Sequence, residues 1–294
     1  MTQPSHLTRR FFLQPGASGF AAASVGLPAL AANLTPVIIQ MTWLQSVQFG
    51  GSYIAANKGY WTDAGLEVSL AQGGPNAPVE PPVVSGTALI GISAADYTAA
   101  AVAEGAPFKI IAVAMQKNPF AIASLSDNPV NTPADLIGKR IGMAVANTPV
   151  LEALCTLNNV DISGIEIVPT QYDPAPLVAG QVDCRLCWET DLPVAMTIQG
   201  VDNTTMLMAD HGYAVHSQTY IATEESIATR RDQLIALLKG EVRGWQDYLA
   251  NTDAAAELTV EMFPDAGLGL DTQKLQAELQ VPVKFSVLTA DNGF

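Results

Sequence analysis

The chain has 294 residues, of which 49% are hydrophobic, and it carries 14 Lys and Arg against 28 Asp and Glu, for a formal net charge of −14. This length allows a large core and about two domains. Because so acidic a chain offers no basic surface, nucleic acid and anionic lipid are excluded as expected partners.

The amino terminus differs in composition from the rest of the chain. Residues 1–31 contain no Asp or Glu, and Arg9-Arg10 precede a weakly apolar stretch that ends in Ala29-Leu30-Ala31. This pattern predicts a twin-arginine signal peptide, cleavage after Ala31 and a periplasmic location. A membrane anchor is disfavoured because Gly and Pro interrupt the short apolar run. Loss of both arginines would leave 12 Lys and Arg against 28 Asp and Glu.

The stretch from Val37 to Val68 predicts a strand, a loop, a helix and a second strand. The first strand runs from Val37 toward Trp43, a helix is expected from about Phe49 to Tyr60, and Leu66–Leu70 alternates like a strand. Ligands of open parallel sheets collect outside the carboxyl ends of the strands. Trp43 therefore becomes a candidate wall of a ligand site.

The next segment predicts where the chain changes sheet. A strand at Thr87–Ile92 precedes an Ala-rich helix that ends near Glu104, with Ser93 or Asp96 as its expected cap. The apolar strand Phe108–Met115 is then followed by a second apolar strand, Phe120–Leu125, with no helix between them. This omission indicates a first crossing between two sheets at 116–119.

Further βα units are expected after this crossing, and the chain then returns to the first sheet. The expected elements are a capped turn at Thr132–Leu136, strands at Arg140–Val145, Ile165–Pro169, Cys184–Trp188 and Thr205–Ala209, helices after Asn147 and at Pro174–Gly180 and Thr190–Gly200, a return crossing at Gly212–Ala222, long helices at Glu224–Leu249 and Thr252–Phe263, and a strand-like Val283–Leu288.

These elements predict an α/β protein with two lobes joined by two crossings. Lobe 1 is expected to comprise residues 35–117 plus 218–294, and lobe 2 residues 118–217. A pair of extended connections between lobes is the geometry of a hinge that closes over a ligand.

Several motifs carry a resemblance to a known family. Trp43, the run Gln48-Phe49-Gly50-Gly51 and the run Lys58-Gly59-Tyr60-Trp61 resemble the first βα unit of periplasmic substrate-binding proteins of ABC importers. The most similar subgroup is related to thiamine-pyrimidine synthesis proteins and includes binders of formylaminopyrimidine and of riboflavin. Segments 172–183 and 210–225 are similar to it as well, so the resemblance spans about 35–265.

The resemblance implies a two-lobed, type II-like periplasmic-binding-protein fold and a small-molecule ligand. It also implies an ABC permease and ATPase complex as partners and no catalytic activity. We expect a monomer without a cofactor. The expected ligand is a small aromatic heterocycle, first a thiamine pyrimidine precursor and then a flavin-like ring. A sulfonate or nitrate-type anion comes last, because the expected cleft offers only Lys117 as a cation.

Candidate ligand-binding residues lie at strand ends, at helix starts and at the crossings. Trp43 and Trp188 are expected to hold a ring from opposite sides. For several others a structural role competes with ligand contact. Helix capping is an equal alternative for Glu189 and at least an equal one for Ser93, surface exposure is an equal one for Tyr172, and a structural place is favoured for His216. The full set is Trp43, Gln48, Phe49, Tyr53, Ser93, Gln116, Asn118, Asn147, Tyr172, Trp188, Glu189 and His216.

The three cysteines do not indicate redox or metal chemistry. Cys184 and Cys187 form a CxxC, but they lie in a predicted strand, where residues three apart point to opposite faces. Together with Cys155, they are expected to be buried small hydrophobic residues.

Enzyme motifs are missing from the sequence. It contains no GxSxG, HExxH, P-loop or GxGxxG, and it has only 3 His, so a His-rich metal site is not expected. The cysteine cluster of the related eukaryotic pyrimidine synthase is also absent. A secreted enzyme or a sensor module on the same fold remains the alternative class.

Overall fold

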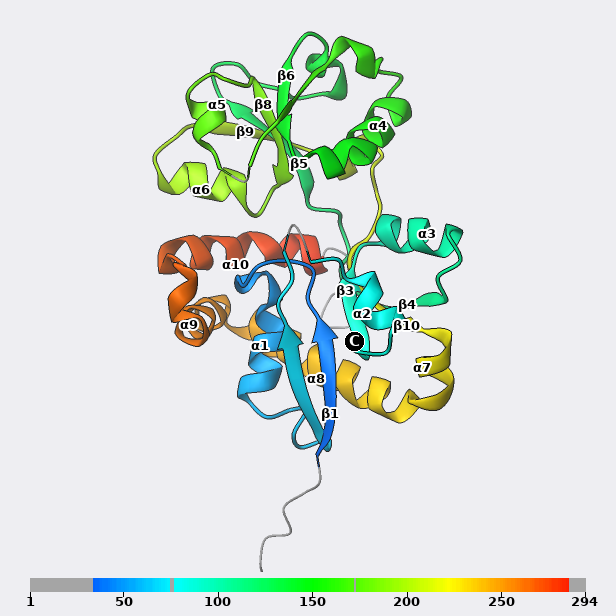
Figure 1. Cartoon of the computed structure of the whole chain (residues 1–294). Helices are drawn as coiled ribbons and strands as arrows, with labels where there is room; N and C mark the ends of the chain where they lie inside the picture. The colour runs from blue at the N-terminus through cyan, green and yellow to red at the C-terminus, as the bar shows by residue number, and fades with distance from the viewer. Residues whose placement is uncertain (1–33, 75–76, 172, 286–294) are drawn as a thin grey trace, which may run out of the picture. The chain divides into compact units, whose positions relative to one another are not determined.

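The computed structural model describes residues 34–74, 77–171 and 173–285 (Figure 1). It contains two five-stranded sheets with helices packed on them. The predicted signal peptide and Tyr172 lie outside the described residues.

The first sheet has the strand order β2-β1-β3-β10-β4, and we call the part of the chain that carries it lobe 1. β1 runs parallel to β2 from Thr35↔Leu66 to Gln40↔Ala71, which confirms the predicted βαβ unit. β10 is antiparallel to both β3 and β4. The elements of lobe 1 are β1 (Thr35–Gln40), η1 (Val47–Phe49), α1 (Gly50–Asn57), β2 (Leu66–Ala71), α2 (Glu80–Val84), β3 (Ile90–Ser93), α3 (Ala95–Ala103), β4 (Phe108–Met115), β10 (Ser217–Thr223), α7 (Glu224–Thr229), α8 (Arg231–Ala250), α9 (Thr252–Met262), η6 (Pro264–Ala266) and α10 (Leu270–Phe285).

The second sheet has the order β7-β6-β8-β5-β9, and its part of the chain is lobe 2. β6 pairs in parallel with β7 and β8, whereas β5 is antiparallel to β8 and β9. The elements are β5 (Phe120–Leu125), η2 (Pro133–Leu136), β6 (Arg140–Met143), η3 (Val145–Asn147), α4 (Thr148–Leu157), η4 (Ile162–Gly164), β7 (Glu166–Pro169), α5 (Ala175–Val178), β8 (Cys184–Trp188), α6 (Leu192–Ile198), β9 (Asn203–Leu207) and η5 (Met208–His211).

The two crossings occur where the sequence predicts them. β4 belongs to the first sheet and β5 to the second, with only residues 116–119 between them, and β10 returns to the first sheet after β9 and η5. The two-lobed α/β fold with two crossings is thereby confirmed. The residue boundaries of the lobes stay a prediction. The assignment of each strand to its sheet agrees with them.

The sheet of lobe 2 separates two apolar clusters. Cys184 packs in the cluster that contains Ile141 and Leu151, whereas Cys187 packs in the one that contains Leu177. The two thiols therefore lie on opposite faces of β8 and are free and buried, as predicted.

The glycines of the Gln48–Gly51 motif allow two helices of lobe 1 to approach closely. A Cβ on Gly51 would lie 2.3 Å from the ring of Trp245, and one on Gly244 would lie 2.0 Å from the carbonyl oxygen of Gly51. Only glycine fits at both positions of the α1–α8 contact. This contact places Trp245 and Tyr248 in a core cluster of lobe 1.

Three local predictions were wrong. Of the strand expected at Val283–Leu288, the described residues to Phe285 belong to α10, which continues through Pro282, and residues 286–288 lie outside the described residues. The expected helix Glu224–Leu249 is two helices, since Arg230 leaves the helical conformation at φ −127° and ψ 27°. Ser93 does not cap α3, because its hydroxyl donates to Glu80 Oε1 at 2.6 Å, and Asp96 lies inside the first turn of that helix.

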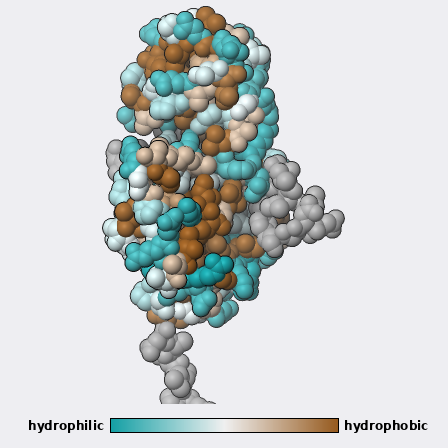
Figure 2. Space-filling model, turned by 90° about the vertical axis from the view of Figure 1, so that its right-hand side faces the viewer, coloured by the Kyte–Doolittle hydropathy of each residue, from teal (hydrophilic) through white to brown (hydrophobic). Residues whose placement is uncertain are grey.

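The surface of lobe 1 includes an apolar edge. β4 is the last strand of its sheet and leaves Ile110 43% exposed. The side of the molecule that carries this edge shows a patch of apolar residues (Figure 2). Among the described residues, no helix combines the length and the hydrophobicity that a membrane crossing requires.

Candidate functional site

The loop after β1 carries the first candidate residues. Ser46 begins η1, and its Oγ accepts from the backbone N–H of Gln48 at 3.4 Å. Trp43 is half-buried beside the core of lobe 1, and Gln48 is only 7% exposed. This loop follows the carboxyl end of a parallel strand, the usual ligand-binding edge of such sheets.

Phe49 and Tyr53 lie in the core of lobe 1. Both are almost fully buried, and their rings meet edge to face with centroids 6.4 Å apart. Tyr53 also contacts the ring of Phe263 at 4.8 Å, and burial raises the pKa of its hydroxyl. The structure therefore places these two predicted residues behind the segment of residues 41–48, which we call the candidate binding loop, and they support it from the core.

The polar side chains at the first crossing form hydrogen bonds with backbone groups. Asn118 is buried, donates from Nδ2 to the carbonyl oxygen of Val215 at 2.6 Å and accepts from the N–H of Phe120 at 2.9 Å. It thus ties the outgoing crossing to the returning one. Gln116 is half-buried and donates to the carbonyl oxygen of Val113 at 3.4 Å, and the exposed His216 accepts from a backbone N–H through its own carbonyl oxygen.

Lobe 2 contributes Trp188 and Glu189 from the carboxyl end of β8. Trp188 is half-buried and meets Phe120 edge to face at 6.2 Å. Glu189 is also half-buried, and its N–H donates to the carbonyl oxygen of Pro119. Burial raises the pKa of the Glu189 carboxyl, nearby Lys117 opposes the shift, and Asp210 adds to it. Lys117 itself pairs with Asp210 at 2.8 Å.

Hydrogen bonds between described residues join the two lobes on two sides. Tyr213 of lobe 2 donates to Asp96 Oδ2 on α3 at 2.8 Å. Next to it, the Tyr97 hydroxyl donates to Oδ1 of the half-buried Asn147 at 3.4 Å. On the other side, Gln276 of α10 donates to Asp191 Oδ1, at the start of α6, at 3.2 Å. Helices α3 and α10 therefore both reach lobe 2.

The sequence did not reveal a buried polar network at the hinge. Lys284 on α10 is fully buried, and its Nζ donates to Gln218 Oε1 and, at 3.2 Å, to the carbonyl oxygen of Gln48. The same Nζ lies 3.7 Å from the ring centre of Trp245. Gln218 has a left-handed φ of 47° in the return crossing, a costly conformation for a non-glycine residue. α10 thus locks the binding loop to the hinge.

Glu241 on α8 continues this network into the core. Its carboxylate accepts from Ser52 Oγ at 2.8 Å and from the Tyr220 hydroxyl at 3.0 Å, and that hydroxyl accepts from Trp245 Nε1 at 3.2 Å. Burial raises the pKa of Glu241 to about 7 and lowers that of Lys284 well below its ordinary value. The only sign of this polar network in the sequence is the spacing of polar residues along α10, which places them on one face of the helix. That spacing does not indicate burial.

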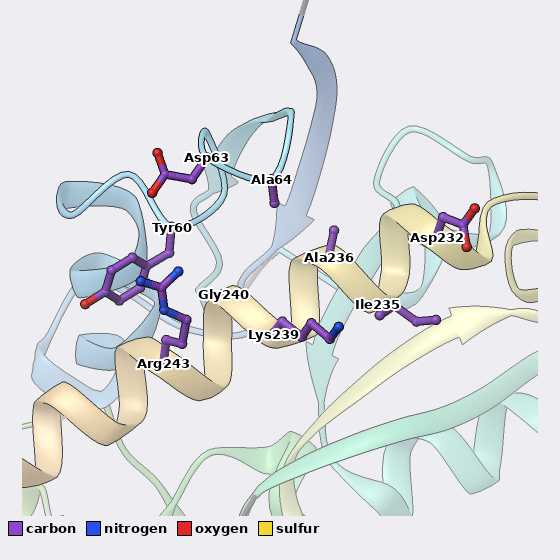
Figure 3. A pocket seen from close by; sticks show the side chains of 9 residues that line it. All are labelled: Tyr60, Asp63, Ala64, Asp232, Ile235, Ala236, Lys239, Gly240 and Arg243. Carbon is purple, nitrogen blue, oxygen red and sulfur yellow. The ribbon is translucent and has the colours of Figure 1, made fainter.

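A surface pocket of about 430 Å³ lies between α8 and the segment after α1. Figure 3 shows Arg243 against the ring of Tyr60, with the guanidinium carbon 3.7 Å from the ring centre, and Asp63, Asp232 and Lys239 around the rim. None of the twelve predicted site residues lines it. Among the described residues, no group of three His, Cys, Asp or Glu is arranged for a metal ion.

A family model described as NMT1/THI5 like matches residues 46–255. The chain belongs to the NMT1/THI5-like family. Riboflavin-binding protein RibY of Chloroflexus aurantiacus is 28% identical over 93% of this chain and 80% of its own length. The formylaminopyrimidine-binding protein of Halalkalibacterium halodurans is 19% identical over 84% of this chain and 77% of its own.

The solved structures agree with this membership. The periplasmic aliphatic sulphonate binding protein SsuA from Escherichia coli superimposes with a TM-score of 0.68 at 14% identity, covering 83% of each chain. At this identity the likeness establishes the fold of this NMT1/THI5-like protein and not its ligand. The family predicted from the sequence is confirmed. The two relatives that match over more than four fifths of this chain are named binding proteins, and a 4-amino-5-hydroxymethyl-2-methylpyrimidine phosphate synthase of Legionella pneumophila is 22% identical over 49% of this chain.

Proposed function

We propose that this protein is the periplasmic solute-binding component of an ABC importer and that it captures a flat nitrogen heterocycle between its lobes. The importer's permease and ATPase would be its partners, and the protein would act as a monomer. Family membership, the two-lobed fold and the names of the curated relatives support the transport role.

The proposal that the ligand is an aromatic ring rests on the placement of the tryptophans. Trp61 and Trp245 are buried core residues, at 2% and 5% exposure. Trp43 and Trp188 are only half-buried, and each follows or ends a strand at its carboxyl end, one in each lobe. Two indoles so placed suit an aromatic ring, with each contact adding about 0.5–1.5 kcal/mol beyond area burial.

The ring is proposed to be flavin-like first and a thiamine-type pyrimidine second. The relative with the greater identity and coverage is named a riboflavin-binding protein, which reverses the order that the sequence motifs favoured. Glu189 supports either ring, because its half-buried carboxylate can accept from a ring N–H. A sulfonate is disfavoured because Lys117 is already paired with Asp210 and Lys284 is buried in the hinge network.

Thermal unfolding with a ligand panel tests the proposal. The panel contains riboflavin, 4-amino-5-hydroxymethyl-2-methylpyrimidine and an aliphatic sulfonate. A ligand at about 100 times its Kd stabilises the folded state by about 2.7 kcal/mol, so one of the two heterocycles should raise the unfolding midpoint. A rise with the sulfonate alone would contradict the proposed ligand class.

A further inference from the structure

Two buried amide atoms near the binding loop have no hydrogen-bond partner. They are Nε2 of Gln48, which is 7% exposed, and Oε1 of Gln280, which is 1% exposed. One is a donor and the other an acceptor. Buried polar groups are nearly always paired, so an unpaired one needs an explanation in function or strain.

The two residues lie in one interface. On α10, the residues 273, 276, 280 and 284 recur at spacings of three and four and therefore share a face. Gln273 Oε1 accepts from the N–H of Val47 at 2.7 Å, and Lys284 Nζ donates to the carbonyl oxygen of Gln48. Gln280 lies between these two anchors, on the face that meets η1.

Hydrogen bonds hold the side-chain amide of Gln280 and the backbone of Gln48. Gln280 donates from Nε2 to the carbonyl oxygen of Gln276 at 3.3 Å, which leaves Oε1 as the open end and assigns the orientation of the amide. The backbone oxygen of Gln48 accepts from both Lys284 and Gln218. The neighbouring Gln273 on the same face of α10 is paired, since its Oε1 accepts from Val47 and its Nε2 donates to Gln276, so the unpaired amide atom on this face belongs to Gln280.

We infer that Gln48 and Gln280 form a donor–acceptor pair that reads the edge of the bound ring, so that α10 is a wall of the ligand site. The pair fits a planar edge that presents a carbonyl or ring nitrogen beside an N–H. The imide edge of a flavin and the N–C–NH₂ edge of an aminopyrimidine both have this pattern. A sulfonate offers acceptors only and leaves Gln280 Oε1 unpaired.

Access to the pair requires more than an opening of the hinge. Separation of the lobes breaks the bond between Gln276 and Asp191. The bonds of Gln273 to Val47 and of Lys284 to Gln48 join α10 to η1 within lobe 1, so α10 must also shift from η1 before a ligand edge reaches the pair. The inference rests on the proposed function, because it assigns residues to that same site.

The test compares riboflavin with 3-methylriboflavin, whose imide N–H is blocked, by fluorescence titration. In the wild type the methyl group should weaken binding about fivefold or more, as expected for a lost buried hydrogen bond. In Gln280→Met riboflavin itself should bind about fivefold more weakly, and the two ligands should bind within about twofold of each other. Gln48→Met should likewise weaken riboflavin binding.

Gln273→Met is the matched control, since this glutamine is buried on the same face but already paired. It should lower the unfolding midpoint and keep the discrimination against the methylated ring, whereas Gln280→Met should keep the wild-type midpoint. If riboflavin does not bind to the wild type, the aminopyrimidine and its N-methylated amine replace the two probes.

If Gln280→Met binds riboflavin with the wild-type affinity and discriminates against 3-methylriboflavin as the wild type does, this inference is overturned and the proposed function stands. A wild type that binds neither heterocycle would overturn both.

Discussion

The two lobes have similar sheets but differ in how their buried charges are held. In lobe 2, Arg185 is buried and donates to backbone carbonyl oxygens of its own lobe, those of Gly142, Gln171 and Asp173. In lobe 1, Lys284 and Glu241 connect side chains and backbone from α10, α8, α1, η1 and β10. Lobe 2 is thus a self-contained core, whereas lobe 1 depends on contacts between distant parts of the chain.

This difference follows from connectivity. Lobe 2 is one continuous segment, so every strand of its sheet comes from the stretch between Phe120 and Leu207. Lobe 1 combines the start and the end of the described chain, and α10 completes it by inserting Lys284 beside Trp245. The buried charge fixes one register of α10 against the binding loop, a role that polar core residues serve in other proteins.

The largest expected effect is on lobe 1 through Lys284→Ala. The change removes the Lys284 donor from Gln218 Oε1 and one of the two donors to the carbonyl oxygen of Gln48, takes a cation from beside Glu241 and opens a cavity. We expect a loss of about 3–5 kcal/mol in the free energy of unfolding, measured by denaturant titration.

Lys274→Ala on the same helix is the matched control for this variant. Lys274 forms surface ion pairs with Asp253 and Glu257, so its loss should leave the unfolding transition unchanged. Equal transitions for the two variants would show that the buried network does not hold lobe 1 together.

The next effect concerns the pH dependence of lobe 1. Burial raises the pKa of Glu241 from 4.5 to about 7, so the folded state binds this proton more tightly than the unfolded state. The stabilisation is fully present below pH 4.5 and is lost as pH rises through 7. The wild type should therefore lose about 3 kcal/mol relative to Glu241→Gln over this range. Denaturant titrations of both proteins across the range measure it, and parallel pH profiles would contradict the buried carboxyl.

The smallest effect is expected in lobe 2, on its thiols. Burial raises the pKa of Cys184 to about 12 and also raises that of Cys187, so neither thiol forms a reactive thiolate near neutral pH. A thiol reagent should label both cysteines only after the protein is unfolded. Rapid labelling of both in the native protein would mean that lobe 2 opens more readily than its apolar core indicates.

The sequence predicted the order of elements, both crossings and the family, because these depend on local periodicity and on motifs with strong steric requirements. Gly51 illustrates this, since its lack of a side chain is dictated by the ring of Trp245. The environment of Lys284 was not predictable, because nothing local distinguishes a buried lysine from an exposed one. The burial of Phe49 and Tyr53 behind the loop likewise depends on α8 and α9, which come far later in the chain.

The measurement that tests the account most directly is a calorimetric titration of riboflavin and of the aminopyrimidine into the wild type and into Trp43→Ala. We expect saturable binding at one site for one of these rings, weakened about tenfold in Trp43→Ala at an unchanged unfolding midpoint, and largely retained in Trp43→Phe. Absence of saturable binding by either ring, or equal affinity in wild type and Trp43→Ala, would contradict a site in which a heterocycle is held between the tryptophans of the two lobes.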